Sequence, residues 1–355
     1  MRLVCNSVTC RALRALALVA AAALAPVTVA LAQSDENAAP PAQQAHPSLQ
    51  TLDQAQRSQD YTAVQIRRFV APAAAGAPST VTSVRERLEV AANGSAKPSF
   101  ALTFLGVEGE PAGSPLSLKW QQTYARHAAR FFAHGSFRVR DLTVASANYT
   151  THDFGAVTRA GRSARRLVVF PTSFDKSIWL VEIDDVTAVS LYAAEFDSHL
   201  NLLAEVETVN FADSVGAFTP VASTAAPVAG FAAGKAAMGD PAGLVEPALT
   251  ATSEYQLDRV EVQNDPLNGA WTMTLTYTDG VDQFVVTQSP GTPDAFAALP
   301  GKANGGTVIG RFRDAAMSAL VFWEGGVSFQ IAGRGSLRRL DDFAKGVYLQ
   351  ALAGN

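Results

Sequence analysis

The amino-acid sequence predicts an α+β protein with two antiparallel sheets, a larger N-terminal one and a smaller C-terminal one that ends in a helix. Three observations support this. Strand-like runs joined by short turns fill the second half of residues 53–218. An alternating run with a hairpin signal at Asp279-Gly280 lies in residues 243–355. Residues 219–242, rich in Ala, Gly and Pro, separate the two regions, so we expect two domains and a linker.

Residues 1–32 have the pattern of a cleavable signal peptide. Three arginines precede an apolar run, and a small-x-small cleavage pattern ends at Ala32. The alternative is a permanent membrane anchor, but Pro26 and the cleavage pattern favour removal. Cys5 and Cys10 both lie in this leader, so the mature chain cannot form a disulfide. We therefore expect an exported, periplasmic protein.

The composition indicates a globular protein that does not bind nucleic acid. The formal net charge is −4, charged residues make up 17% of the chain and apolar ones 48%. Nucleic-acid-binding proteins carry a basic face, and the slight excess of acidic residues argues against one here. Residues 33–52 are polar, contain proline and lack periodicity, so they are predicted to form a disordered lead-in.

The N-terminal domain is predicted to contain one strong helix among several strands. The helix covers residues 117–134, where apolar side chains recur about every 3.6 residues. Two strands precede it, and four follow as a meander with turn-forming connections. In chain order, the predicted strands are residues 61–70, 79–90, 164–170, 177–183, 188–196 and 202–211.

The C-terminal domain alternates cleanly between apolar and polar positions. Met273, Leu275 and Tyr277 share one face with Trp271, and threonines occupy the other. Further strands are predicted at residues 306–313, 318–326 and 327–333. A closing helix is predicted at residues 336–352, with Ser336 as its N-cap. Its buried stripe consists of Leu337, Leu340, Phe343, Ala344 and Val347.

The four-strand meander raises the question of whether its carboxylates form an active site. Side chains alternate along a strand, and a short antiparallel turn carries the alternation to the next strand. The resulting apolar face consists of Val168, Phe170, Trp179, Val181, Ile183, Tyr192, Phe196, Leu202 and Val206. The opposite, solvent face receives Glu182, Glu195, Glu205 and Glu207, while Asp184 and Asp185 occupy a turn. A catalytic acid pair would have to converge in a cleft, so we predict no catalytic role for these acids.

The apolar face must be covered, and the helix around residues 120–132 is the expected cover. Two alternatives stay open at this point. The face could be part of an ordinary close-packed core, or a curved sheet could leave a cavity that holds an apolar ligand.

Other signals of catalysis or metal binding are weak. His127 and His134 are seven residues apart, too far for a chelating pair on a helix, and the mature chain has no cysteine to assist them. No Gly-x-Ser-x-Gly motif occurs. We predict no catalytic residue, metal or cofactor. Arginines at 126, 130, 138, 140, 159, 162, 165 and 166 are interpreted as solvated surface, or as a site for an anionic headgroup or acidic partner.

Residues 137–211 resemble the N-terminal domain of the MucB/RseB family of periplasmic sigma-E regulatory proteins, which has the fold of LolA-type lipoprotein carriers. The resemblance is carried by "AGR" at residues 160–162, "LVVFP" ending at Pro171, "WLVEIDDVT" ending at Thr187, and "AAEFDSHLNLLAEVE". The segments "YTDGVDQFVVT", "FWEGGVSFQIAG" and "LRRLDDFAKGV" resemble the smaller C-terminal domain of the same proteins.

This resemblance implies a half-barrel whose concave face, covered by helices, holds acyl chains. It also implies a non-enzymatic regulator that binds the periplasmic domain of a membrane anti-sigma factor and releases it when lipid or lipopolysaccharide binds during envelope stress. The alternative is a periplasmic lipid or lipoprotein carrier, and an envelope hydrolase is a third hypothesis. The oligomeric state stays open, with a homo-oligomer among the options.

Overall fold

The structure of the protein is a computed structural model. The described residues are 48–71, 80–95, 97–134, 136–173, 176–221, 225–249, 254–265, 269–291, 310–314, 317–324, 326–333, 340 and 343–347. The predicted leader, the first part of the predicted lead-in, Ser336 and Leu337 lie outside these residues.

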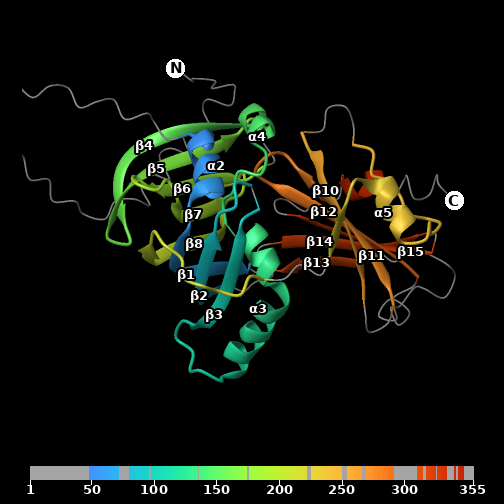
Figure 1. Ribbon diagram of the computed structural model, residues 1–355, viewed down its shortest axis with the longest axis horizontal. Coiled ribbons are helices and arrows are strands. Elements are labelled where there is room, and N and C mark those ends of the chain that lie inside the picture. The colour runs from blue at the N-terminus through green and yellow to red at the C-terminus, as the bar shows by residue number, and fades with distance from the viewer. Residues whose placement is uncertain are drawn as a thin grey trace, which may run out of the picture. The chain divides into compact units, whose positions relative to one another are not determined.

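The first sheet has eight antiparallel strands in the order β3-β2-β1-β8-β7-β6-β5-β4, so it is open, with β3 and β4 at its edges (Figure 1). Its strands are β1 (Tyr61–Ala71), β2 (Thr80–Ala91), β3 (Ser99–Val107), β4 (Tyr149–Arg159), β5 (Arg162–Pro171), β6 (Ile178–Asp184), β7 (Ser190–Phe196) and β8 (Leu202–Ala212). The six strands predicted for the N-terminal domain are confirmed. Strands β3 and β4 were not predicted.

The second sheet has seven strands in the order β13-β14-β15-β12-β11-β10-β9. They are β9 (Ala226–Val228), β10 (Gln256–Asn264), β11 (Trp271–Thr278), β12 (Gln283–Pro290), β13 (Gly310–Asp314), β14 (Met317–Glu324) and β15 (Val327–Gly333). The predicted α+β class with two antiparallel sheets is confirmed. Met273, Leu275 and Tyr277 are buried in one core cluster with Leu340, Ala344 and Val347 of the closing segment. Phe343 stacks on Phe284, with ring centroids 5.2 Å apart, so this segment packs on the sheet.

Residues 219–242 are not a plain linker, which corrects the sequence prediction. They contain β9, which pairs with β10, and helix α5 (Phe231–Ala237). Gly234 is buried in α5, and a Cβ added there would lie 3.2 Å from the Met273 side chain. The small side chains that suggested a linker therefore allow this helix to lie close to the second sheet.

Helix α2 (Leu49–Ser58) corrects a second prediction, because it begins inside the stretch predicted to be disordered. Ser48 caps it: the Ser48 side chain accepts from the Thr51 backbone N–H at 3.4 Å, and the Thr51 hydroxyl accepts from the Ser48 N–H at 3.2 Å. Leu49, Leu52 and Ala55 are its buried apolar residues.

Helix α3 (Pro115–His134) covers a different part of the first sheet from the one expected. Its Tyr124, Ala128 and Phe132 pack in a cluster with residues of β1, β2 and β3. The Tyr124 hydroxyl also donates to Glu86, whose carboxylate pairs with Arg67 at 2.6 Å. The helix follows β3 in the chain and packs on that end of the sheet (Figure 1). The expectation that it covers the β5–β8 meander is therefore wrong.

The meander is covered instead by α2, by residues 137–139 and by helix α4 (Leu142–Asn148), which Asp141 caps. No helix among the described residues is long and apolar enough to cross a membrane.

Candidate functional site

We call the side of β5–β8 that α2 covers the helix face. Register defines it: Leu167 of β5 lies opposite Val181 of β6, which lies opposite Ala193 of β7, which lies opposite Val206 of β8. Residues paired across strands project on the same side of a sheet. The core cluster on this face contains Leu49, Leu52, Phe137, Val139, Ala145, Tyr149, Leu167, Val169, Trp179, Val181, Ile183, Ala193 and Val281.

Four of the predicted face residues, Trp179, Val181, Ile183 and Val206, lie on the helix face. Val168 and Phe170 do not: Val168 lies opposite Leu180, and Phe170 is two residues further along the same side of β5. The prediction assumed a symmetric connection between β5 and β6. The actual pairing of β5 with β6 is shifted by one residue, which places every side chain of β5 on the face opposite to the predicted one.

Two β-bulges account for the other differences. The first lies where Glu182 and Ile183 pair with β7, and it moves Tyr192 and Phe196 to the opposite side. The second lies next to Phe196, which pairs with Leu202 at the strand ends; beyond it Val206 returns to the helix face. Val206 is therefore placed correctly only because two irregularities cancel.

Glu182 does not face water, which corrects the prediction for the acids. It is fully buried and receives hydrogen bonds from Arg159 at 2.7 Å and from Arg166 at 2.9 Å. Arg159 also pairs with Glu207 at 2.6 Å. Arg68 joins this network through Glu205 and Glu207, both at 2.9 Å. We call this side of the sheet the charged face; its acids are held by arginines and serve its structure.

Two further acids of the meander, Glu195 and Asp184, are also buried, whereas Asp185 in the turn is exposed. Glu195 lies opposite Trp179, on the helix face, and accepts a hydrogen bond from Ser177 at 2.7 Å. Asp184 caps its turn, as predicted, by accepting from the Thr187 N–H at 2.9 Å, and it also pairs with Arg162. Burial alone would raise the pKa of Asp184, but the hydrogen bonds from Arg162 and Thr187 outweigh it and leave the pKa below its ordinary value.

Several arginines of the arginine-rich segment are buried or held in ion pairs, whereas Arg126 is exposed as predicted. The guanidinium of Arg138 is buried and lies 4.4 Å from the centre of the Phe132 ring, and burial lowers its pKa. Arg165 pairs with Asp153 at 3.0 Å, while Arg159 and Arg166 belong to the charged face. These four arginines hold parts of the fold together through ion pairs and ring contacts.

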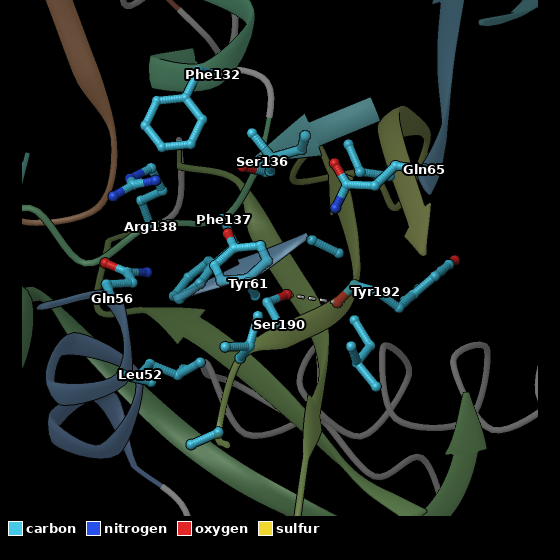
Figure 2. Close-up of a pocket in the computed structure, with 17 residues that line it drawn as sticks. Leu52, Gln56, Tyr61, Gln65, Phe132, Ser136, Phe137, Arg138, Ser190 and Tyr192 are labelled. Carbon is cyan, nitrogen blue, oxygen red and sulfur yellow. Dashed lines mark hydrogen bonds between the residues drawn. The ribbon is translucent and has the colours of Figure 1, made fainter. Parts of the chain in front are cut away.

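A small cavity of about 40 Å³ lies beside α2 at the helix face (Figure 2). Leu52 and Gln56 of α2, Tyr61 of β1, Phe137 and Ser190 are among the residues that line it. A single buried water needs roughly 10–15 Å³, whereas pockets for small ligands span about 300–1,000 Å³. In this conformation the helix face is thus a close-packed core with room for a few waters.

On the other side of α2 lies an open groove of about 410 Å³. Gln50, Gln54 and Ser58 of α2 form one wall, and the β6–β7 turn with Val186 forms the other. Val186 is 81% exposed, an unusual position for a large apolar side chain. Ala55 and Ala188 line both the cavity and the groove. Helix α2 is therefore a cover with space on two sides.

The prediction of a disordered lead-in overlooked a signal for α2 in the sequence. Ser48 followed three residues later by a polar Thr51, with Leu49, Leu52 and Ala55 spaced by three, is typical of a capped amphipathic helix. The composition of the preceding residues outweighed it. Among the described residues, no group of three or more His, Cys, Asp or Glu side chains could hold a metal ion.

Comparison with known proteins gives distant structural likenesses. The chain is similar to MucB. A crystal structure of MucB in complex with MucA(peri) matches at 13% identity and a TM-score of 0.44, covering 83% of this chain and 95% of that chain. The Pseudomonas aeruginosa MucA/MucB complex matches at 14% identity and a TM-score of 0.45, with the same coverage.

A putative outer membrane lipoprotein-sorting protein domain from Vibrio parahaemolyticus matches at 11% identity and a TM-score of 0.19, covering 48% of this chain and 93% of that chain. No family model matches, and no curated protein matches. Likenesses at these identities and TM-scores carry no argument about the function of this chain.

Proposed function

We propose that this protein is an exported, non-enzymatic regulator that binds an acyl chain on the helix face, after displacement of α2, and binds the periplasmic segment of a membrane anti-sigma factor. The observation that carries the lipid part is the position of α2. It is a short helix with space on both sides, and it covers the apolar β5–β8 face through Leu49, Leu52 and Ala55.

The apolar burial that an acyl chain gains is comparable with what α2 loses when it is displaced. Burying two leucine side chains stabilises the closed position of α2 by roughly 3–6 kcal/mol. An acyl chain with ten buried methylenes gains about 8 kcal/mol from the same effect, at about 0.8 kcal/mol each. The burial of an acyl chain can therefore offset the apolar contacts that the helix loses. A polar ligand would gain much less on a face whose central residues are Val181, Ala193 and Val206.

The protein partner is proposed from the sequence resemblance. Segments of both sheets resemble the two domains of the MucB/RseB proteins in the same order. The solved MucB structures include complexes with the periplasmic part of MucA. On the sequence resemblance, we propose that an anti-sigma factor binds the lipid-free form of the present chain, and that acyl-chain or lipopolysaccharide binding releases it.

The experiment compares two variants of the exported chain, Val181→Glu on the helix face and Val81→Glu on β2. Val181 is fully buried and Val81 is 55% exposed. Binding of a fluorescent sixteen-carbon fatty acid, and of the periplasmic segment of the anti-sigma factor encoded beside a sigma-factor gene, is titrated for each. Circular dichroism establishes that each variant is folded.

We expect the native chain and Val81→Glu to bind both ligands, and folded Val181→Glu to lose the fatty acid. If Val181→Glu does not fold, Ala193→Glu gives a second test, because Ala193 lies directly opposite Val181. A folded helix-face variant with unchanged fatty-acid affinity would overturn the assignment of the face. Fatty-acid binding without anti-sigma binding would replace the regulator by a lipid or lipoprotein carrier. Binding of neither would overturn the proposal.

A further inference from the structure

The tip of the β11–β12 hairpin is buried, although hairpin turns usually lie at the surface. Asp279, Val281 and Asp282 are only 0%, 3% and 5% exposed. Asp279 shapes the turn by accepting hydrogen bonds from the backbone N–H of Val281 at 3.1 Å and of Asp282 at 2.7 Å. The sequence predicted this turn correctly, but gave no sign that it would be covered.

The cover comes from the segment that precedes α4 and from α4 itself. The Arg140 backbone N–H donates to the Gly280 carbonyl at 2.8 Å, and the Arg140 side chain donates to the Val281 carbonyl at 3.0 Å. Gly280 has φ +99°, and a Cβ added there would lie 2.1 Å from the backbone N of Ala145. Only glycine fits this contact. The hairpin tip is thus seated in a close-fitting recess.

A buried ion pair completes the contact. Lys176, which is 1% exposed, lies with its Nζ 2.8 Å from Asp279 and also pairs with Glu254. The Tyr149 hydroxyl donates to Asp279 at 2.8 Å. The Lys176 ammonium lies 5.1 Å from the centre of the Tyr149 ring and 5.6 Å from that of Tyr255. A buried charge is costly without its partner, so Lys176 and Asp279 each depend on the seated hairpin.

The seated tip and the cover of the helix face contribute residues to the same apolar cluster. Val281 belongs to the same buried cluster as Leu49 and Leu52 of α2, and as Phe137 and Trp179. A ligand that displaces α2 removes Leu49 and Leu52 from the cluster to which Val281 belongs. Conversely, a hairpin that leaves its recess removes Val281 from that cluster. The two positions are therefore linked through one cluster of packed residues.

We propose that the contact of the hairpin tip, residues 279–282, with its recess can open, and that it couples the helix face to the second sheet. We call this contact the dock, and the Lys176–Asp279 ion pair that holds it closed the latch. An acyl chain under α2 weakens the dock, and release of the dock frees the second sheet to change how the protein holds its partner. The evidence for the dock is the set of contacts made by Arg140, Gly280 and Lys176, whereas the coupling rests on the proposed lipid-binding function.

The dock is tested first without any ligand. Spin labels are placed at exposed positions of the two sheets by Val81→Cys and Leu257→Cys, with Cys5 and Cys10 replaced by serine, and distances are measured by double electron–electron resonance. The native background is expected to give one narrow distance distribution, and Gly280→Ala a broad one. Gly326→Ala is the matched control, because Gly326 has φ +77° but nothing within 4 Å of an added Cβ.

The latch is tested by stability. Lys176→Met leaves Asp279 buried without its cation, so the unfolding equilibrium constant should rise by about 10²-fold or more. The double variant Lys176→Met/Asp279→Asn should lose less free energy of unfolding than the two single variants lose together. A narrow distribution for Gly280→Ala, or additive losses for Lys176→Met and Asp279→Asn, would overturn the dock.

The coupling is tested by adding a sixteen-carbon fatty acid to the doubly labelled native background. We expect the distance distribution to broaden on binding, and Gly280→Ala to bind the fatty acid more tightly than Gly326→Ala. An unchanged distribution at demonstrated saturation would overturn the coupling and leave the proposed function in place. Failure of the fatty acid to bind at all would overturn the proposed function and the coupling together, while the ligand-free measurements still decide the dock.

Discussion

Replacing Leu52 of α2 by alanine tests whether this helix is a displaceable cover. Leu52 is 1% exposed and packs in the helix-face cluster beside the existing cavity of about 40 Å³. Truncation of a buried leucine costs about 2–5 kcal/mol, because transfer energy is lost and a larger void is left. If α2 must leave before a lipid enters, the same loss lowers the cost of opening.

The expected gain in affinity follows from this magnitude. A loss of about 2 kcal/mol in the closed position corresponds to roughly thirtyfold tighter apparent binding of an acyl chain, as long as opening limits the affinity. The assay is titration with a fluorescent sixteen-carbon fatty acid, accompanied by hydrogen exchange of the α2 amides. These amides should exchange faster in Leu52→Ala even without ligand.

The matched control is Gln54→Ala, because Gln54 lies on the exposed side of the same helix. It should bind the fatty acid as the native chain does. Folded Leu52→Ala with unchanged or weaker affinity would refute the reasoning, since it would show that α2 is either a required part of the binding site or unrelated to it.

Three further predictions concern the scaffold. Glu182→Gln removes the charge that two arginines share, and should lower the free energy of unfolding, measured with urea, by about 1.5–3 kcal/mol; no loss would show that the network is dispensable. The pKa of Asp184 lies below its ordinary 3.8, so the stability it adds is present at neutral pH and is lost as the pH falls below about 4. Asp184→Asn should flatten that part of the stability–pH curve, and an unchanged curve would contradict the assignment. Gly333→Ala should cost about 1–3 kcal/mol in the same urea assay, because its Cβ would lie 2.2 Å from the Phe284 ring, whereas Gly346→Ala, which meets nothing within 4 Å, should cost nothing.

The sequence predicted well wherever a local pattern alone decides the structure. The alternation of Met273, Leu275 and Tyr277 defines a buried face, and Asp279-Gly280 forms the predicted hairpin turn. The strands of the meander were found from their composition and turns. These features depend on neighbouring residues only, so a single sequence contains the information.

The candidate site was harder to predict because it depends on pairing between strands. Alternation placed Trp179, Val181 and Ile183 together, since they belong to one strand. It failed for Val168 and Tyr192, because a one-residue offset or a bulge reverses the face and has no reliable signal in the sequence.

The charge pairs were missed for a related reason. Arg159 and Glu182 are 23 residues apart in the chain, and Lys176 and Asp279 are more than one hundred residues apart. Carboxylates and arginines are usually exposed, so a sequence alone favours solvent for each of them. Their burial results from partners that only the fold brings together.

The central claim, that an acyl chain binds on the helix face under α2, is tested most directly by photolabelling. The native chain is saturated with a sixteen-carbon fatty acid that contains a diazirine group, irradiated, digested and analysed by mass spectrometry. The account predicts labels on peptides that contain Leu167, Val181 and Val206, whose side chains line that face across three strands. Labels confined to peptides of the second sheet or of the charged face would contradict it.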